Sequence, residues 1–258
     1  MPPGEYSVDV VHRATFAERG RQMSEGPAGE FASHRLRVAG VDVEDLVLRT
    51  GPGFSVSGRV SGRGGRVGTD DKKGFTITAE PPADRLSAAV SARRANGGPD
   101  DRFELRNVSG LYVLRASNLP SGLMVTEVLA DGVDVIDSGV EITRNMDVEV
   151  VLGPQSALTG TVADARGRPV ASAAVVVFAE DPARWSLTQT RYVKTMPVRP
   201  DGSFNVEGLG PARYYVAAFR TEPGRPPEDV EDLERLIPGA ARVTIRNGES
   251  TSVSVRID

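Results

Sequence analysis

The stretch Phe204-Asn-Val-Glu-Gly-Leu-Gly-Pro-Ala-Arg-Tyr-Tyr-Val-Ala-Ala-Phe219 decides the fold predicted for this chain. Two apolar runs flank a turn rich in glycine and proline, which is the pattern of two short β-strands. The stretch recurs as Phe103-Glu-Leu-Arg-Asn-Val-Ser-Gly-Leu-Tyr-Val-Leu-Arg-Ala116, and its tyrosine part recurs alone as Pro2-Pro-Gly-Glu-Tyr-Ser-Val8. We expect the phenylalanine strand and the tyrosine strand to form a hairpin whose rings point into the core of a β-sandwich.

The repeat extends beyond this stretch. Ser57-Gly-Arg-Val60 and Thr159-Gly-Thr-Val162 start two full copies, and the period of roughly 100 residues is the size of one immunoglobulin-like sandwich. Glycine and proline lie together at 51–53 and 153–154, as expected of linkers. The sequence therefore predicts an all-β fold of tandem immunoglobulin-like (transthyretin-like) β-sandwiches. Its expected parts are a partial sandwich at 1–52, equivalent to the second half of a copy, and complete sandwiches at 53–153 and 154–258.

Several single elements follow from local pattern. Ala173–Phe178 is a continuous apolar run between turns, which predicts a strand buried on both faces. One short helix is expected near 227–237, where prolines and acidic residues begin an amphipathic stretch. Asn247-Gly248 between two alternating runs predicts a hairpin at the C-terminal end. Short strands are also expected at 36–38 and 46–48, and loops at 13–34, 61–74 and 179–199.

Composition excludes several classes of function. The chain has 258 residues, no cysteine and a formal net charge of -4. Disulfides, thiol catalysis and cysteine metal sites are therefore excluded, and the lack of a basic stripe argues against a nucleic-acid partner. No apolar run approaches the roughly 18 residues of a membrane span, so no direct membrane insertion is expected. The start, Met1-Pro-Pro-Gly-Glu-Tyr6, lacks the basic and apolar regions of a signal peptide.

The last part of the chain carries a family resemblance. Asp164-Ala-Arg-Gly-Arg-Pro-Val170 is followed by Ala173-Ala-Val-Val-Val177 (the pattern Ala-x-Val-x-Val), by Pro200-Asp-Gly-Ser-Phe-Asn-Val-Glu-Gly-Leu209 and by Tyr214-Tyr-Val-Ala-Ala218. This order resembles the carboxypeptidase regulatory-like domain family, which has a transthyretin-like or starch-binding-like β-sandwich. The resemblance spans 154–258 and is weaker across 53–153. It implies no catalytic residues, because members of the family are accessory sandwiches beside peptidases, within outer-membrane receptors or in strings in exported bacterial proteins.

Three patterns that could be mistaken for sites have structural explanations. His12 and His34 lack the spacing of zinc ligands, so we interpret them as solvated loop residues. Gly62-Arg-Gly-Gly-Arg-Val-Gly68 leads into a strand, whereas a phosphate-binding loop leads into a helix. The acids of Ala130-Asp-Gly-Val-Asp-Val-Ile-Asp137 lack the pattern of a calcium loop and suit a strand with turn residues. No metal or cofactor is therefore predicted.

Trp185 is the single tryptophan, and it lies just beyond the buried run with Tyr192 nearby. Aromatic rings exposed at the loops of a sandwich can stack on sugars, so Trp185 and Tyr192 are the candidate ligand-binding residues. The alternative, which we favour, is that Trp185 closes the core, packed against the helix near 227–237.

These patterns predict a non-catalytic structural or interaction module. It would space or display other domains of a larger exported bacterial protein, or mediate protein contacts, in an extracellular, periplasmic or cell-surface location. The alternative is a carbohydrate-binding module that uses Trp185 and Tyr192 to hold a polysaccharide. An enzyme is not expected, because the sequence offers no nucleophile, base or carboxylate pair in a recognisable arrangement.

Overall fold

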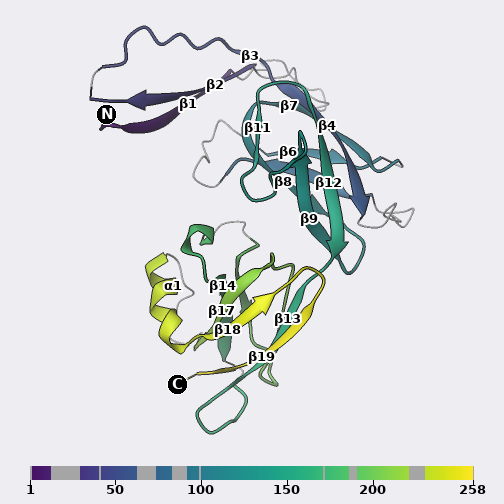
Figure 1. Cartoon of the computed structure of the whole chain (residues 1–258), viewed down its shortest axis with the longest axis vertical. Coiled ribbons are helices and arrows are strands. Elements are labelled where there is room, and N and C mark those ends of the chain that lie inside the picture. Colours follow the sequence, from purple (N-terminus) through teal and green to yellow (C-terminus); the bar gives the residue numbers. More distant parts are fainter. Residues whose placement is uncertain are drawn as a thin grey trace, which may run out of the picture. The chain divides into compact units, whose positions relative to one another are not determined.

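The computed structural model describes residues 2–12, 30–40, 42–62, 74–82, 92–98, 100–170, 172–185, 191–220 and 230–257. The chain forms two compact units. One contains Met1–Ser121 and Glu127–Leu152, and the other contains Gly122–Thr126 and Gly153–Asp258. The fold is all-β, with one short α-helix among the described residues (Figure 1).

The first strands are β1 Gly4–His12, β2 Glu30–Val38, β3 Gly51–Pro52, β4 Phe54–Gly62, β5 Thr76–Glu80 and β6 Arg93–Asn96. They continue with β7 Arg102–Val108, β8 Gly110–Ser117, β9 Leu123–Ala130, β10 Val133–Asp134, β11 Val140–Ile142 and β12 Met146–Pro154. The later strands are β13 Ala157–Ala163, β14 Ala173–Ala179, β15 Val193–Pro197, β16 Ser203–Glu207, β17 Ala212–Arg220, β18 Ala241–Ile245 and β19 Ser250–Arg256. The helical segments are η2 Pro182–Arg184, α1 Val230–Leu236 and η3 Ile237–Gly239.

Strands β4 to β12 form two sheets that share a core. One sheet has the order β10-β9-β12-β4-β7, and the other has the order β11-β8-β5-β6. Alternate residues face the interior, such as Val56 of β4 and Ile77 of β5, which are fully buried. Phe75, directly before β5, meets Phe103 of β7 edge to face with 6.5 Å between the ring centroids. The two sheets therefore pack as a sandwich.

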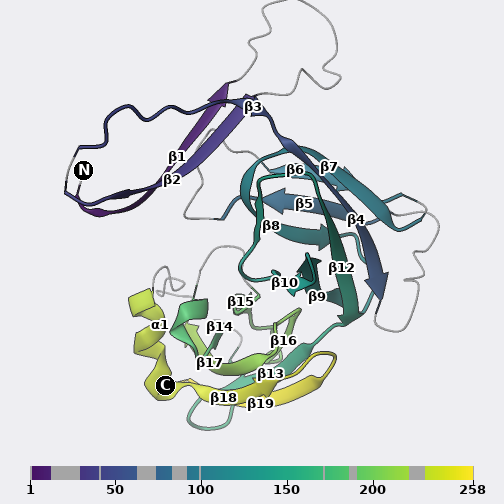
Figure 2. The ribbon, with the colours of Figure 1, turned by 45° about the horizontal axis from the view of Figure 1, so that its top comes forward.

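Strands β13 to β19 repeat this topology (Figure 2). Their sheets have the orders β16-β13-β19 and β15-β14-β17-β18. In each repeat the first strand pairs antiparallel with the phenylalanine strand and parallel with the last strand. These pairs are β4 with β7 and β12, and β13 with β16 and β19. The tandem β-sandwiches predicted from the sequence are confirmed.

The phenylalanine and tyrosine strands do not form hairpins, which corrects the expectation from the sequence. Strands β7 and β16 lie in one sheet of their sandwich, whereas β8 and β17 lie in the other. The connection crosses between the sheets, with positive φ at Asn107 and Gly110 in the first repeat and at Gly208 in the second. The four rings are buried as expected: Phe103, Tyr112, Phe204 and Tyr214.

The expected C-terminal hairpin is also wrong. Strand β18 pairs with β17, and β19 pairs with β13 in the other sheet. At the turn, Glu249 N donates to Arg246 O at 3.2 Å, and of the pair Asn247-Gly248 only Gly248 has a positive φ, of 73°. A type I′ hairpin turn needs positive φ at both central residues. The turn therefore redirects the chain to the facing sheet.

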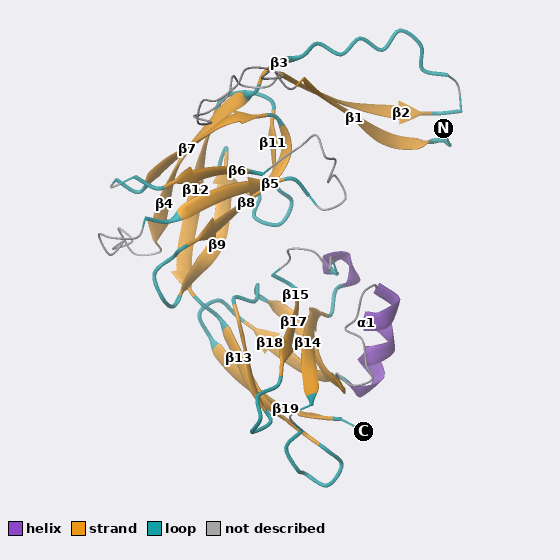
Figure 3. Cartoon of the chain, turned by 180° about the vertical axis from the view of Figure 1, so that it is seen from behind, coloured by secondary structure: helices purple, strands orange, loops and turns teal. Residues whose placement is uncertain are grey.

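Strand β14 is buried on both faces, as predicted, because all of its residues are buried. One face points into the sandwich, and α1 lies over the other (Figure 3). The helix runs over 230–236 and continues as η3, close to the expected 227–237, of which 227–229 lie outside the described residues. It is inserted between β17 and β18, at the place where the first repeat inserts β9 and β10 between β8 and β11.

Three loop and strand boundaries differ from the expectation. Strand β2 begins at Glu30, so 30–34 is not part of the loop expected at 13–34, and 13–29 lie outside the described residues. Strand β15 lies within the loop expected at 179–199. Residues 61–62 end β4, and 63–73 of the loop expected at 61–74 lie outside the described residues.

The N-terminal residues form a three-stranded sheet of order β1-β2-β3. Among the residues up to 52 whose burial the structure describes, Val38 is the one that is buried. The strand expected at 46–48 is not formed, because 42–50 has no strand partner among the described residues and is almost wholly exposed.

Candidate functional site

Trp185 ends a short turn at the edge of the second sandwich. Asp181 caps this turn by accepting a hydrogen bond from Ala183 N at 3.1 Å. The indole is 6% exposed and meets the Phe178 ring edge to face, with 5.4 Å between centroids. Its Nε1 donates to Ala179 O. The apolar ring of Trp185 is therefore buried within the protein, and its polar N–H has a hydrogen-bond acceptor there.

The cluster around Trp185 connects the sheet to the helix. Its buried members are Val176 and Phe178 from β14, Ala217 from β17, and Leu233 from α1. Leu233 is fully buried, although it is far from Trp185 in the sequence. Trp185 therefore packs in a cluster with the helix, which is the alternative favoured from the sequence.

Tyr192 belongs to a different cluster, the interior of the sandwich, and is 5% exposed. The guanidinium carbons of Arg184 and Arg191 lie 4.4 Å and 5.2 Å from its ring centroid. Gly210 leaves room for the ring, since a Cβ at residue 210 would lie 2.7 Å from Tyr192 Cε1. The structure does not bring Trp185 and Tyr192 together as one exposed platform. A sugar-binding role for either residue stays a prediction.

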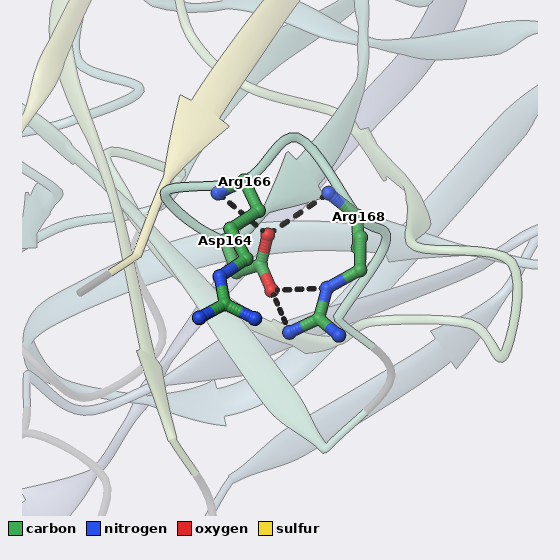
Figure 4. Close-up of polar contacts among 3 residues, drawn as sticks. All are labelled: Asp164, Arg166 and Arg168. Atoms are coloured by element: carbon green, nitrogen blue, oxygen red, sulfur yellow. Dashed lines mark hydrogen bonds and ion pairs between the residues drawn. The ribbon is translucent and has the colours of Figure 1, made fainter.

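One carboxylate holds the turn of the motif that starts at Asp164 (Figure 4). Its Oδ1 accepts hydrogen bonds from the backbone N–H groups of Arg166 and Arg168, each at 2.9 Å. Its Oδ2 accepts a hydrogen bond from Arg168 Nε at 2.9 Å. The backbone N–H of Arg168 and then its guanidinium lower the pKa of Asp164. Asp164 therefore stabilises this turn.

Asp201 has the same role before β16. Its Oδ1 accepts a hydrogen bond from Ser203 N at 2.9 Å. The hydroxyl and then the backbone N–H of Ser203 lower the pKa of Asp201. The two acidic turns of the family-like motif are thus structural features of the second sandwich.

Lys194 is a half-buried cation that the sequence did not single out. It lies in β15, and its Nζ donates to the backbone oxygen of Glu207 in β16, across the two sheets. Burial lowers the pKa of Lys194, and the charge of Glu207 opposes this shift. Asn205 Nδ2 donates to Glu207 Oε1 at 2.9 Å. A single lysine in a polar strand gives no sequence signal for such a contact.

A hollow of about 920 Å³ lies along the outer face of the five-stranded sheet. Its charged lining residues are Arg59, Arg102, Glu104, Asp131, Asp147 and Glu149. Several of these are ion-paired, since Arg59 lies 3.2 Å from Glu149 and Asp131 lies 2.6 Å from Arg144. Phe103, the one aromatic lining residue, is 5% exposed. The hollow therefore has paired charges along its lining and no exposed aromatic ring on which a sugar could stack.

The two histidines and the acidic stretch at 130–137 are the remaining residues that the sequence analysis weighed as possible metal sites. His34 is exposed on β2, and the side chain of His12 is outside the described set. Asp134 Oδ1 accepts hydrogen bonds from Val128 N at 3.0 Å and Ile136 N at 3.1 Å, so it serves the β9–β10 hairpin. Within the described ranges, no group of three or more histidine or acidic side chains could hold a metal ion. Nor does any described helix have the length and apolar character to cross a membrane.

No protein-family model matches the chain, and no curated protein matches it. Solved structures similar to it include the Bacillus anthracis TIE protein, at 12% identity and a TM-score of 0.28, covering 98% of this chain and 43% of that one. A streptococcal ancillary pilin has 16% identity and a TM-score of 0.29, covering 99% of this chain and 76% of that one. A minor pilin of Streptococcus agalactiae has 12% identity and a TM-score of 0.31, covering 79% of this chain and 94% of that one. The chain thus spans less than half of the TIE protein chain, and similarities at this level carry no argument about function.

Proposed function

We propose that this chain is a non-catalytic structural module that spaces or displays other domains of a larger exported bacterial protein, or mediates protein contacts at the cell surface. We also place it with the carboxypeptidase regulatory-like sandwiches, and we divide it into a partial sandwich at 1–52 and complete ones at 53–153 and 154–258. The family assignment is supported by the Asp164 turn and by the buried Phe204 and Tyr214 of the motif.

We infer the structural role from the parallel pairing of the first and last strand of each repeat. Seven residue pairs join β4 to β12, and seven join β13 to β19. Because these strands are parallel, the chain enters a sandwich at one end of the ladder and leaves at the other. A force along the chain therefore loads all the ladder hydrogen bonds together. This geometry suits a spacer under tension.

Force spectroscopy on the second sandwich tests this role. The chain has no cysteine, so introduced cysteine pairs give unique attachment points. Gln155→Cys with Arg256→Cys pulls the β13–β19 ladder in shear, since these residues lie near its opposite ends. Gln155→Cys with Glu249→Cys is the matched control, because both residues lie near one end and the pull opens pairs one at a time. We expect a several-fold higher unfolding force in shear. Equal forces would count against a mechanical role.

A further inference from the structure

Strand β1 is equivalent to the tyrosine strand of the complete repeats. Tyr6 OH donates to Pro2 O at 2.7 Å, and Tyr214 OH donates to Gly210 O at 2.7 Å, in each case four residues back. Strand β2 pairs antiparallel with β1, as β18 pairs with β17. The β1–β2 pair therefore corresponds to β17–β18, and Tyr6 corresponds to Tyr214.

The complete repeats place a strand on both edges of the tyrosine strand. Strand β17 lies between β14 and β18, and β8 lies between β5 and β11. Strand β1 has β2 on one edge, and the described residues supply no strand for its other edge. Backbone N–H and C=O groups along such an edge are a template for another strand.

The apolar face of β1 is also less buried than the equivalent face of β17. Tyr6, Val8 and Val10 alternate on one face and are half-buried. Their counterparts Tyr214 and Val216 are fully buried in the sandwich. On the opposite face, Glu5 pairs across the ladder with Arg37, and both are exposed.

The segment after β2 pairs with no strand among the described residues. In the complete repeats, the strand that follows the equivalent of β2 is β12 or β19, which pairs parallel with the first strand of its repeat. Here the corresponding segment 42–50 is unpaired among the described residues and exposes Val43, Leu46 and Val47 at 49%, 40% and 75%. In the complete repeats, the open edge of β1, its apolar face and segment 42–50 would all contact the strands of the first half of the sandwich.

We propose that the free edge and apolar face of β1 form a docking site for a β-strand donated by a partner protein. The complete repeat defines its chemistry, because β14 supplies a run of small β-branched residues that pairs antiparallel with β17. Val177 lies opposite Val216, and Val175 lies opposite Ala218. The same register puts the donated valines opposite Val8 and Val10. Main-chain hydrogen bonds give such a complex affinity, and the side-chain pockets give it specificity.

Strand β14 of a second copy of this chain does not fit the role of donor. It is buried on both faces and is paired on both edges, with β15 and β17. The inference rests on the proposed role as an interaction module and names the kind of partner. It involves neither β13 nor β19, so its failure would leave the mechanical role intact.

Hydrogen exchange on the full chain tests the site. The probe is a synthetic peptide of residues 172–181 with lysines added at both ends for solubility. We expect it to slow the exchange of outward-facing β1 amides by about tenfold or more, with β13–β19 unchanged. The matched control peptide carries Val175→Asp and Val177→Asp, which remove the valines that face the core.

Two protein variants sharpen the test. Val8→Asp should abolish the protection of β1, whereas Glu5→Ala on the exposed face should keep it, and an unchanged Trp185 emission shows that the second sandwich remains folded. Equal protection by both peptides, or none by either, overturns the proposal. Protection that grows with chain concentration alone, together with dimers in sedimentation, would instead identify a second copy as the occupant and would also overturn it.

Discussion

A glycine near the start of each repeat leaves space for a phenylalanine ring to pack against the backbone. Gly160 of β13 pairs with Phe204 of β16, as Gly58 pairs with Phe103. A Cβ at residue 160 would lie 2.5 Å from Phe204 Cζ and would also collide with the backbone oxygen of Val253. Because a backbone atom cannot move aside, we expect Gly160→Ala to destabilise the second sandwich by about 1–3 kcal/mol. Urea unfolding monitored by Trp185 emission measures this.

Gly239→Ala is the control for this substitution. A Cβ there meets nothing within 4 Å, and its φ is not positive. Its free energy of unfolding should stay within about 0.5 kcal/mol of that of the parent chain. If the two variants have the same free energy of unfolding, the packing of Phe204 against Gly160 does not stabilise the sandwich.

Asp164 makes the stability of the second sandwich depend on pH. Its native pKa is lowered, mainly by the backbone N–H of Arg168, from an unfolded-state value of about 3.9. The carboxylate therefore stabilises the native state above the unfolded-state pKa, and this contribution is lost as pH falls through the native pKa. Asp164→Asn keeps an oxygen acceptor for the two N–H groups but removes the charge.

The expected result is that Asp164→Asn is less stable than the parent chain near neutral pH, and that the two converge below about pH 4. Urea midpoints of both proteins across this range give the comparison. A constant difference at all pH values would show that the charge contributes nothing.

At the scale of elements, α1 has one fully buried residue, Leu233. Leu233 is fully buried against Phe178, Trp185 and their neighbours. We expect Leu233→Ala to cost about 2–5 kcal/mol of stability and to shift the Trp185 emission, because the indole loses a neighbour. Val230→Ala, on the same helix at 44% exposure, should change the stability by less than about 1 kcal/mol. An unchanged emission in Leu233→Ala would contradict the packing of Trp185 against the helix.

The strands were predictable, but their pairing was not. Alternation places Phe204 and Tyr214 in strands with their rings inside, and both rings are buried. The same local pattern, two apolar runs around a turn, fits either a hairpin or a crossing between sheets. The partners that decide between them, β13 for β16 and β14 for β17, lie far away in the sequence. The two incorrect hairpins have this common cause.

The candidate site has the same limitation. The sequence singles out Trp185 because it is unique, yet its environment depends on Leu233 and Ala217 from other elements. Local pattern therefore left open whether the ring stacks on a ligand or packs. The Lys194 contact with the Glu207 carbonyl was missed because it joins strands of facing sheets.

At the scale of the whole molecule, the chain combines two β-sandwiches with the three-stranded sheet β1-β2-β3. The complete repeats have ladders on both edges of their tyrosine strands, whereas β1 has one. Stability within one chain can thus differ between regions, since local opening requires little free energy where few apolar contacts are buried.

We therefore expect hydrogen exchange of the full chain, without added peptide, to rank its strands. Amides of β1 and β2 should exchange at least about a hundredfold faster than those of β14, because Tyr6, Val8 and Val10 of β1 are only half-buried, whereas every β14 residue is buried. Strand-resolved mass spectrometry measures both in one sample, so β14 serves as the internal reference. Equal protection of β1 and β14 would mean that the free edge is already covered, and the donated strand would then have nowhere to add.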